Sequence, residues 1–253
     1  MTDKKTSAAP PSAGPKGERI AKRLAAQGLC SRREAERWIA DGRIAVNGTV
    51  LTTPAFTVGP SDAIAVDGKL IVDKVAKPKL WRYHKPTGLI TTHSDPRGRP
   101  TVFANLPKDL PRVISVGRLD FDSEGLLLLT NSGDLARKLE HPDQAWLRRY
   151  RARVHGYPQQ ATLDKLAAGI TVEGVRYGPI EAQIERAQKG ANAWITLSLR
   201  EGKNREVRRV LEHLGLGVMR LIRVAYGPFQ LGTLEAGKVE GVAEKVLREQ
   251  VGS

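Results

Sequence analysis

The stretch that decides the fold is GRLDFDSEGLLLLTNSGD, residues 117–134. The strand-like residues Val113–Val116 run into it, and a polar stretch around Asp120 follows. The uninterrupted aliphatic run Leu126–Leu129 then predicts a second strand, which ends in Thr130 and a turn. The pattern therefore predicts two buried strands with a carboxylate between them.

A carboxylate in that position, with Arg118 beside it, is placed to be desolvated and to have a shifted pKa. This makes Asp120 a candidate for chemistry. An ordinary turn between strands explains the pattern equally well, and Asp122 and Glu124 are competing carboxylates in the same loop.

Outward from this loop, strand and helix patterns alternate along residues 81–250. Strand patterns occur at Trp81–His84, Gly88–Thr92, Tyr150–Val154, Val175–Ile184 and Trp194–Leu199. Helix spacing occurs at Leu135 and Leu139, at Leu163 and Leu166, and most clearly from Val207 to Leu214, with Asn204 as the expected cap and Gly215 as the stop. We expect an α+β domain around a mixed, mainly antiparallel sheet.

The N-terminal part has a different organisation. An apolar helical face over residues 20–25 precedes Ser31-Arg32-Arg33-Glu34, which matches a capping box for a second helix. The turn pairs Asn47-Gly48 and Asp67-Gly68 each lie between apolar residues and predict hairpins. We therefore expect a disordered basic tail at 1–17, a small helix-plus-hairpin domain at 18–73, a linker at 74–80 and the larger domain at 81–250.

The net charge of the 253-residue chain is +14, from 41 Lys and Arg against 27 Asp and Glu. Such a charge attracts polyanions, and nucleic acid is the commonest polyanion that a soluble protein meets. Residues 19–43 hold seven basic and three acidic residues. We expect phosphate contacts from Arg32, Arg33, Arg37 and Arg43, although a solvated charged face is the alternative.

Several function classes lack their sequence signals. The single cysteine, Cys30, excludes an intrachain disulfide, and the five scattered histidines show no metal-ligand spacing. No glycine-rich phosphate loop and no nucleophile elbow is present. No aliphatic run is long enough for a membrane span, and residues 1–17 lack the apolar centre of a secretory signal. We expect a cytoplasmic monomer that works without metal or cofactor.

Four motifs together resemble the pseudouridine synthases that modify ribosomal RNA, the group typified by RsuA and RluB. The G-R-L-D segment at 117–120 resembles their catalytic motif, and Lys85-Pro86-x-Gly88 resembles their K-P-x-G strand. The segments RRYRARV at 148–154 and GKNREVRR at 202–209 match two further motifs. The stretch SRREAERWIADGRIAVNG at 31–48 resembles the small RNA-binding domain that precedes the catalytic domain in this group.

The resemblance implies a role for each matched position. Asp120 would be the essential carboxylate, Tyr150 would stack on the target uracil, and Arg208 would pair with Asp120. It also implies that the partner is ribosomal RNA, either 23S rRNA or a pre-ribosomal particle. Two alternatives stay open: the same reaction on 16S rRNA, and a non-catalytic RNA-binding or ribosome-assembly protein. Further RNA contacts are expected at Lys85, Arg118, Lys203, Arg205 and Arg209.

Overall fold

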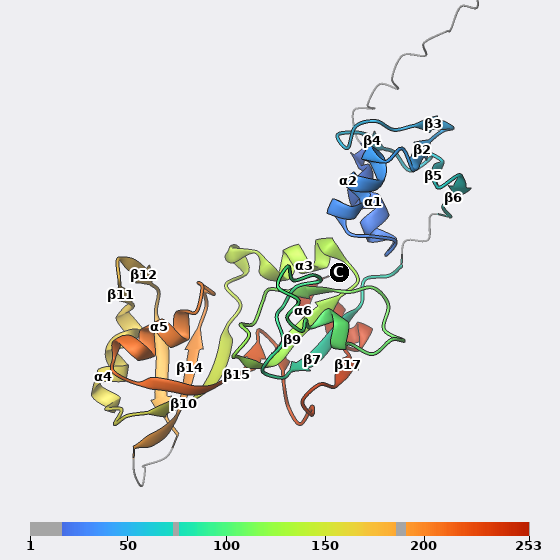
Figure 1. The fold of residues 1–253 in the computed structure, drawn as a ribbon. Coiled ribbons are helices and arrows are strands. Elements are labelled where there is room, and N and C mark those ends of the chain that lie inside the picture. The colour runs from blue at the N-terminus through green and yellow to red at the C-terminus, as the bar shows by residue number, and fades with distance from the viewer. Residues whose placement is uncertain (1–16, 73–75, 186–190, 253) are drawn as a thin grey trace, which may run out of the picture. The chain divides into compact units, whose positions relative to one another are not determined.

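The computed structural model describes residues 17–72, 76–185 and 191–252, and the chain divides into two units, Met1–Lys77 and Pro78–Ser253 (Figure 1). The elements of the first unit are β1 (Glu18–Arg19), α1 (Ile20–Ala26), α2 (Arg32–Ala40), β2 (Ile44–Val46), β3 (Thr49–Val50), β4 (Thr57–Val58), β5 (Ile64–Val66) and β6 (Lys69–Leu70).

Local sequence signals build this first unit. The Ser31 hydroxyl accepts from the Glu34 amide and the Glu34 carboxylate accepts from the Ser31 amide, so the capping box is confirmed. Asn47-Gly48 and Asp67-Gly68 adopt the positive φ that a tight hairpin turn requires. The strands form a sheet in the order β3-β2-β5-β6, and the apolar faces of both helices pack with β2 and β5 in one buried cluster.

The second unit is built around a large sheet. The strands of this second unit are β7 (Leu80–Lys85), β8 (Ile114–Val116), β9 (Glu124–Thr130), β10 (Arg148–His155), β11 (Ile170–Val172), β12 (Val175–Tyr177), β13 (Ile180–Ile184), β14 (Asn192–Leu199), β15 (Gly217–Tyr226), β16 (Phe229–Gln230) and β17 (Val239–Gly241). Its helices are η1 (Phe103–Asn105), α3 (Gly133–Glu140), η2 (Pro142–Gln144), α4 (Gln160–Asp164), η3 (Lys165–Ala168), α5 (Glu206–His213) and α6 (Glu244–Val251). Strands β11 and β12 pair with each other outside the large sheet.

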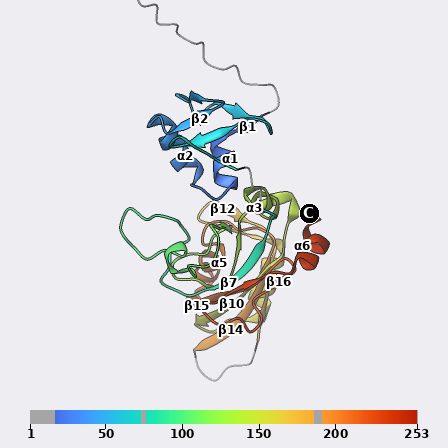
Figure 2. The same ribbon diagram turned by 90° about the vertical axis from the view of Figure 1, so that its right-hand side faces the viewer.

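The sheet runs in the order β13-β14-β10-β15-β9-β7-β17, with β16 beside β15 and β8 beside β9. Within the described residues β15 and β9 are its one parallel pair, so the predicted mixed, mainly antiparallel sheet is confirmed. Helices α4 and α5 cover the half formed by β13, β14, β10 and β15, and α3 and α6 pack beside β7 and β9 (Figures 1 and 2).

Strand β9 is covered on both faces, which explains its unbroken run of apolar residues. Leu126 and Leu128 pack with α3 and α6, and Leu127 and Leu129 pack with the segment 89–113 on the other face. All seven residues of β9 are buried. Because β9 is packed on both faces, it holds the start of the strand, and the loop that precedes it, in a fixed position.

Three local predictions were wrong. Gly88–Thr92 is a loop with one isolated bridge rather than a strand, because its backbone bonds go to different segments: the Gly88 amide to the Phe121 carbonyl, and Ile90 to Pro100 and Val102. Val175–Ile184 is two strands, since Gly178-Pro179 separates β12 from β13. Helix α5 is capped by Arg205 rather than Asn204, and Arg205 adopts a left-handed conformation there with φ of 51°.

Candidate active site

Asp120 begins the turn that joins β8 to β9. The Ser123 amide donates to the Asp120 carbonyl at 3.1 Å, so Phe121 and Asp122 occupy the corner of a β-turn. The Asp120 side chain is 28% exposed, and it is therefore partly desolvated but still open to a ligand.

Lys85, at the end of β7, donates hydrogen bonds to the backbone of this turn. Its ammonium group has no exposed surface and donates to the carbonyls of Pro86 (3.1 Å), Asp120 (2.9 Å) and Ser123 (2.8 Å). Lys85 was expected to contact RNA. That expectation was wrong, because all three donors are used inside the protein.

The charge of Lys85 is balanced locally. Burial lowers the pKa of Lys85 to about 8, although the carboxylates of Asp120, Asp122 and Glu124 favour its protonated form. A buried cation therefore lies under a loop that carries three carboxylates. This arrangement keeps negative charge at the site stable in a poorly hydrated environment.

The segment after β7 braces the other side of the loop. The Thr91 hydroxyl donates to the Leu119 carbonyl at 2.8 Å and accepts from the Leu119 amide at 3.3 Å. The Gly88 amide donates to the Phe121 carbonyl at 2.8 Å. The K-P-x-G segment thus contributes structure to the site through both its lysine and its glycine.

Two buried arginines complete the set of donors. Arg223 on β15 donates to the carbonyls of Leu126 (2.8 Å) and Arg118 (3.4 Å), and Arg208 on α5 donates to the Asp122 carbonyl (2.8 Å). Every carbonyl from residue 118 to residue 123 therefore accepts a hydrogen bond within the protein. Such a loop is preorganised, as a catalytic carboxylate requires.

The ion pairs differ from the expected one. Arg208 was expected to pair with Asp120, but its Nε lies 3.3 Å from the Asp122 carboxylate instead. Arg205 donates to both Asp122 oxygens at 3.1 and 3.2 Å and lies 3.9 Å from the Asp120 carboxylate. Burial alone would raise the pKa of Asp122, but the Arg205 hydrogen bonds and the Arg208 and Arg205 charges outweigh it and lower that pKa.

Tyr150 lies two strands from the Asp120 loop. It is half-buried on β10 opposite Arg223 on β15, and Arg223 in turn lies opposite Gly125, the second residue of β9. Neighbouring strands are about 4.8 Å apart, so the backbones of Tyr150 and Gly125 lie roughly 10 Å apart across the sheet. The Tyr150 side chain packs against the buried cluster that includes Leu119, the residue before Asp120.

The remaining basic positions fall into two groups. Arg32, Arg33, Arg37 and Arg118 are exposed, as RNA contacts must be. The others have partners or are covered: Arg43 is bonded to Asp67 and stacked on Trp38, Lys203 is bonded to Glu201, and Arg209 is half-buried.

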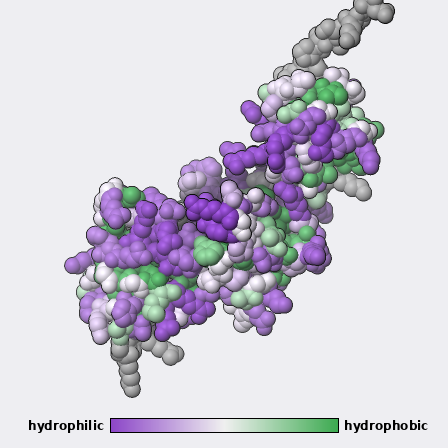
Figure 3. Space-filling view, viewed as in Figure 1, coloured by the Kyte–Doolittle hydropathy of each residue, from purple (hydrophilic) through white to green (hydrophobic). Residues whose placement is uncertain are grey.

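Hydrophilic side chains cover much of the surface drawn in Figure 3. No helix in the described part of the chain is long and apolar enough to cross a membrane. Across residues 17–72, 76–185 and 191–252, no group of three or more His, Cys, Asp or Glu side chains is arranged to hold a metal ion.

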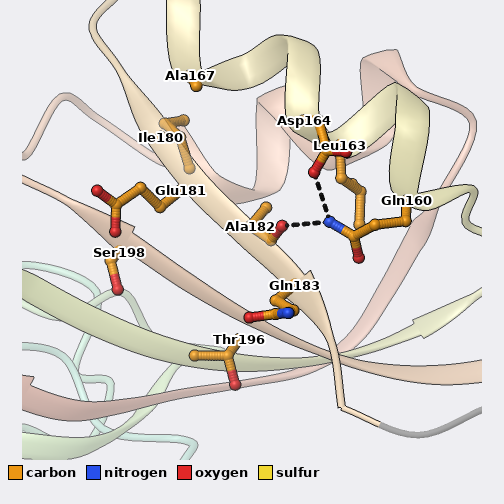
Figure 4. A pocket seen from close by; sticks show the side chains of 10 residues that line it. All are labelled: Gln160, Leu163, Asp164, Ala167, Ile180, Glu181, Ala182, Gln183, Thr196 and Ser198. Atoms are coloured by element: carbon orange, nitrogen blue, oxygen red, sulfur yellow. Dashed lines mark hydrogen bonds between the residues drawn. The ribbon is translucent and has the colours of Figure 1, made fainter.

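A pocket of about 380 Å³ lies elsewhere, between α4 and the outer strand β13 (Figure 4). Gln160 in its wall donates to the Ala182 carbonyl and accepts from the Ile184 amide, which covers the free edge of β13. None of the expected site residues lines this pocket.

Comparisons with known proteins agree with the geometry. The sequence profile described as RNA pseudouridylate synthase matches residues 79–213, more than half of the chain, and the S4 domain profile matches residues 18–64. The chain belongs to the RNA pseudouridylate synthase family.

Individual members of the family show the same relation. The chain is 45% identical over 233 residues to an uncharacterized RNA pseudouridine synthase of Rickettsia prowazekii, covering 92% of this chain and 97% of the relative. It is 42% identical over 221 residues to the ribosomal large subunit pseudouridine synthase B of Salmonella typhi, covering 85% and 75%. A crystal structure of a pseudouridylate synthase shares the fold, with a TM-score of 0.64 at 23% identity, over 92% of this chain and 99% of that one.

This pseudouridine synthase is therefore an isomerase of the RsuA/RluB group that acts on RNA, with an S4 domain ahead of the catalytic fold. Sequence motifs singled out the Asp120 loop, Tyr150, Arg205 and Arg208 as candidates. Arg223 and Thr91 were missed, because neither stands in a recognisable motif and each reaches the loop only in the folded chain.

Proposed function

We propose that this enzyme isomerises a specific uridine of 23S rRNA to pseudouridine, with Asp120 as its essential carboxylate. The observation that carries the proposal is the Asp120 loop, whose carbonyls all accept internal hydrogen bonds while the Asp120 carboxylate stays partly open. The similarity to ribosomal large subunit pseudouridine synthases B and the N-R-E-V-R-R segment at 204–209 support the 23S assignment.

The reaction requires a carboxylate but no change of oxidation state. The bond between the ribose C1′ and a ring nitrogen of uracil breaks, the base rotates, and C1′ bonds to a ring carbon instead; that carbon then loses its proton and the freed nitrogen gains one. Asp120 must be ionised whether it attacks the sugar, attacks the base or removes a sugar proton. Arg205 lies 3.9 Å from its carboxylate.

The uridine must leave its helix to reach Asp120, because enzymes that act on a base in a stem flip the nucleotide out. Tyr150 is the aromatic surface that we assign to the flipped uracil. Arg208 acts as a positioning residue, since it is buried and donates to the carbonyls of Asp122 and Val218. The exposed Arg32, Arg33 and Arg37 of the S4 domain deliver the RNA through its phosphates.

The decisive experiment maps pseudouridine in ribosomal RNA from cells with and without this enzyme, and from cells that carry Asp120→Asn. One uridine in 23S rRNA should lose its modification in the deletion strain and in the Asp120→Asn strain. Glu124→Gln is the matched control, because Glu124 is paired with Arg220 and should leave modification intact. A site lost from 16S rRNA would overturn the 23S assignment, and normal modification by Asp120→Asn would overturn the role of Asp120.

A further inference from the structure

Phe121 is an aromatic residue in an unusual position. It follows Asp120 directly, at the corner of the turn, and is 48% exposed. Turn corners favour residues such as proline or polar side chains, which tolerate water. Phe121 belongs to none of the buried clusters among the described residues, so it does not contribute to the core.

The exposure of Phe121 is built into the loop. Its carbonyl accepts from the Gly88 amide at 2.8 Å, and the carbonyls of Asp120 and Asp122 on either side of it are held by Lys85 and Arg208. The backbone is thus fixed on both sides of the ring. The turn therefore carries a large, exposed apolar side chain directly after Asp120.

We propose that Phe121 stacks on a nucleobase adjacent to the flipped uridine, and so helps to select the RNA segment that is modified. This inference rests on the proposed role of Asp120. When a nucleotide leaves a stem, its neighbours lose a stacking partner, and an aromatic ring offers a replacement. Stacking on aromatic side chains is a general means of binding unpaired bases.

The surroundings suit RNA better than another apolar partner. Arg118, two residues before Asp120, is exposed, and the Arg205 side chain is 39% exposed beside Asp122. A lone exposed ring bordered by guanidinium groups matches a nucleic acid, because bases stack on the ring while phosphates meet the cations. The half-buried Tyr150 is then left for the flipped uracil itself.

The test uses the full chain with Asp120→Asn, which prevents turnover, and a stem-loop RNA taken around the uridine that the wild-type enzyme modifies. Phe121→Ala in this background should weaken binding by about 5- to 150-fold, the factor that corresponds to one base–aromatic stack. Phe121→Tyr and Phe121→Trp should restore affinity, and Phe121→Leu should restore it partly. Thermal melting should match that of the parent, since Phe121 lies outside the core.

A second RNA series locates the stacked base. The neighbouring nucleotide is replaced by an abasic one, on the 5′ side in one RNA and on the 3′ side in another. On one of the two, Phe121→Ala should cost less than about twofold, because no base remains to stack. Tyr157→Ala is the matched control: Tyr157 is 74% exposed beyond the far end of β10, and its loss should not alter affinity.

Two results would overturn the inference: equal affinity of Asp120→Asn with and without Phe121→Ala on intact RNA, or the same loss on both abasic RNAs. Failure of the proposed function looks different. It appears as a wild-type enzyme that modifies another RNA, or as an active Asp120→Asn, and the binding comparison is then made on the RNA that is modified.

Discussion

Lys85 has no exposed surface, and its ammonium group donates to three carbonyls, two of them in the turn that carries Asp120. Arg208 is 4% exposed and bonds to the Asp122 carbonyl in the same turn. At the scale of single residues, these cations support the Asp120 turn through its backbone. Their substitution should therefore alter stability as well as activity.

Lys85 makes a prediction about pH. Burial lowers its pKa to about 8, below the ordinary value near 10.5, so between these values the unfolded chain binds more protons than the folded chain. The free energy of unfolding should then rise with pH from about 8 to 10 through this group. Lys85→Met should lose that rise, and should lose about 1–3 kcal/mol for each carbonyl left without a donor.

Urea unfolding of both proteins at pH 7, 8, 9 and 10 checks this prediction. The difference in unfolding free energy between wild type and Lys85→Met should widen as the pH increases. A constant difference would mean that Lys85 keeps an ordinary pKa in the folded protein.

The two arginines of the α5 segment should separate into different roles. Arg208→Met leaves the Asp122 and Val218 carbonyls without the Arg208 donor, at about 1–3 kcal/mol each, while the 43% exposed Asp122 carboxylate keeps Arg205 as its partner. Arg205→Met removes a 39% exposed side chain, so we expect a loss of at most about 1 kcal/mol but a marked fall in turnover. Arg205→Lys retains the charge and should recover part of the turnover.

Thermal melting and single-turnover kinetics on the same RNA distinguish these two arginines. A stable Arg208→Met with a normal melting temperature would show that its hydrogen bonds are not needed for the fold. Unchanged turnover in Arg205→Met would remove Arg205 from the site.

At the scale of elements, the site depends on the parallel pair of β9 and β15. Gly125 on β9 has φ of +105°, and a Cβ there would lie 2.4 Å from the backbone oxygen of Arg223 on β15. The two backbones can approach closely only because position 125 has no side chain. This approach brings the Asp120 loop next to β15 and, one strand further, to Tyr150.

Gly125→Ala should therefore separate these strands. The backbone conformation alone costs about 1–3 kcal/mol, and the overlap with Arg223 adds a similar amount. Gly117→Ala is the matched control: its φ is +67°, but a Cβ there meets nothing within 4 Å, so only the conformational cost remains. Urea unfolding of both variants should show the larger loss for Gly125→Ala; equal losses would contradict the close approach.

At the scale of the whole molecule, the chain consists of two units with separate cores, and the charge is shared between them. Residues 1–77 carry +5 of the net +14, which leaves +9 on residues 78–253. Both units should therefore attract RNA. The S4 unit should add affinity and site selection, while the chemistry belongs to the second unit.

Removal of residues 1–77 should leave a folded protein that still binds RNA, but with a shallower dependence of log affinity on log salt concentration, because fewer phosphates are neutralised. Filter binding between low and moderate salt measures the slope, and circular dichroism checks that the truncated chain folds. An identical slope and identical site selection would show that the S4 unit does not contact the substrate.

The sequence by itself determined the features that depend on neighbouring residues. The capping box of α2 and the hairpins at Asn47-Gly48 and Asp67-Gly68 are local interactions. The unbroken apolar run Leu126–Leu129 by itself indicates a buried strand. The G-R-L-D and N-R-E-V-R-R segments likewise identified the family. In each case the physical cause lies within a few residues of the pattern.

Only the tertiary structure decided which charges meet. Polar and apolar residues do not alternate regularly along β15, because Arg220 and Arg223 interrupt the pattern. The strand nevertheless lies at the centre of the sheet, where its pairing with β10 contains two register shifts. Arg208 pairs with Asp122 rather than Asp120, and Lys85 is buried rather than free for RNA. These outcomes depend on contacts between residues tens to more than a hundred positions apart. Burial and distance in the folded chain decide the partner of each charge. The sequence pattern around a residue does not contain this information.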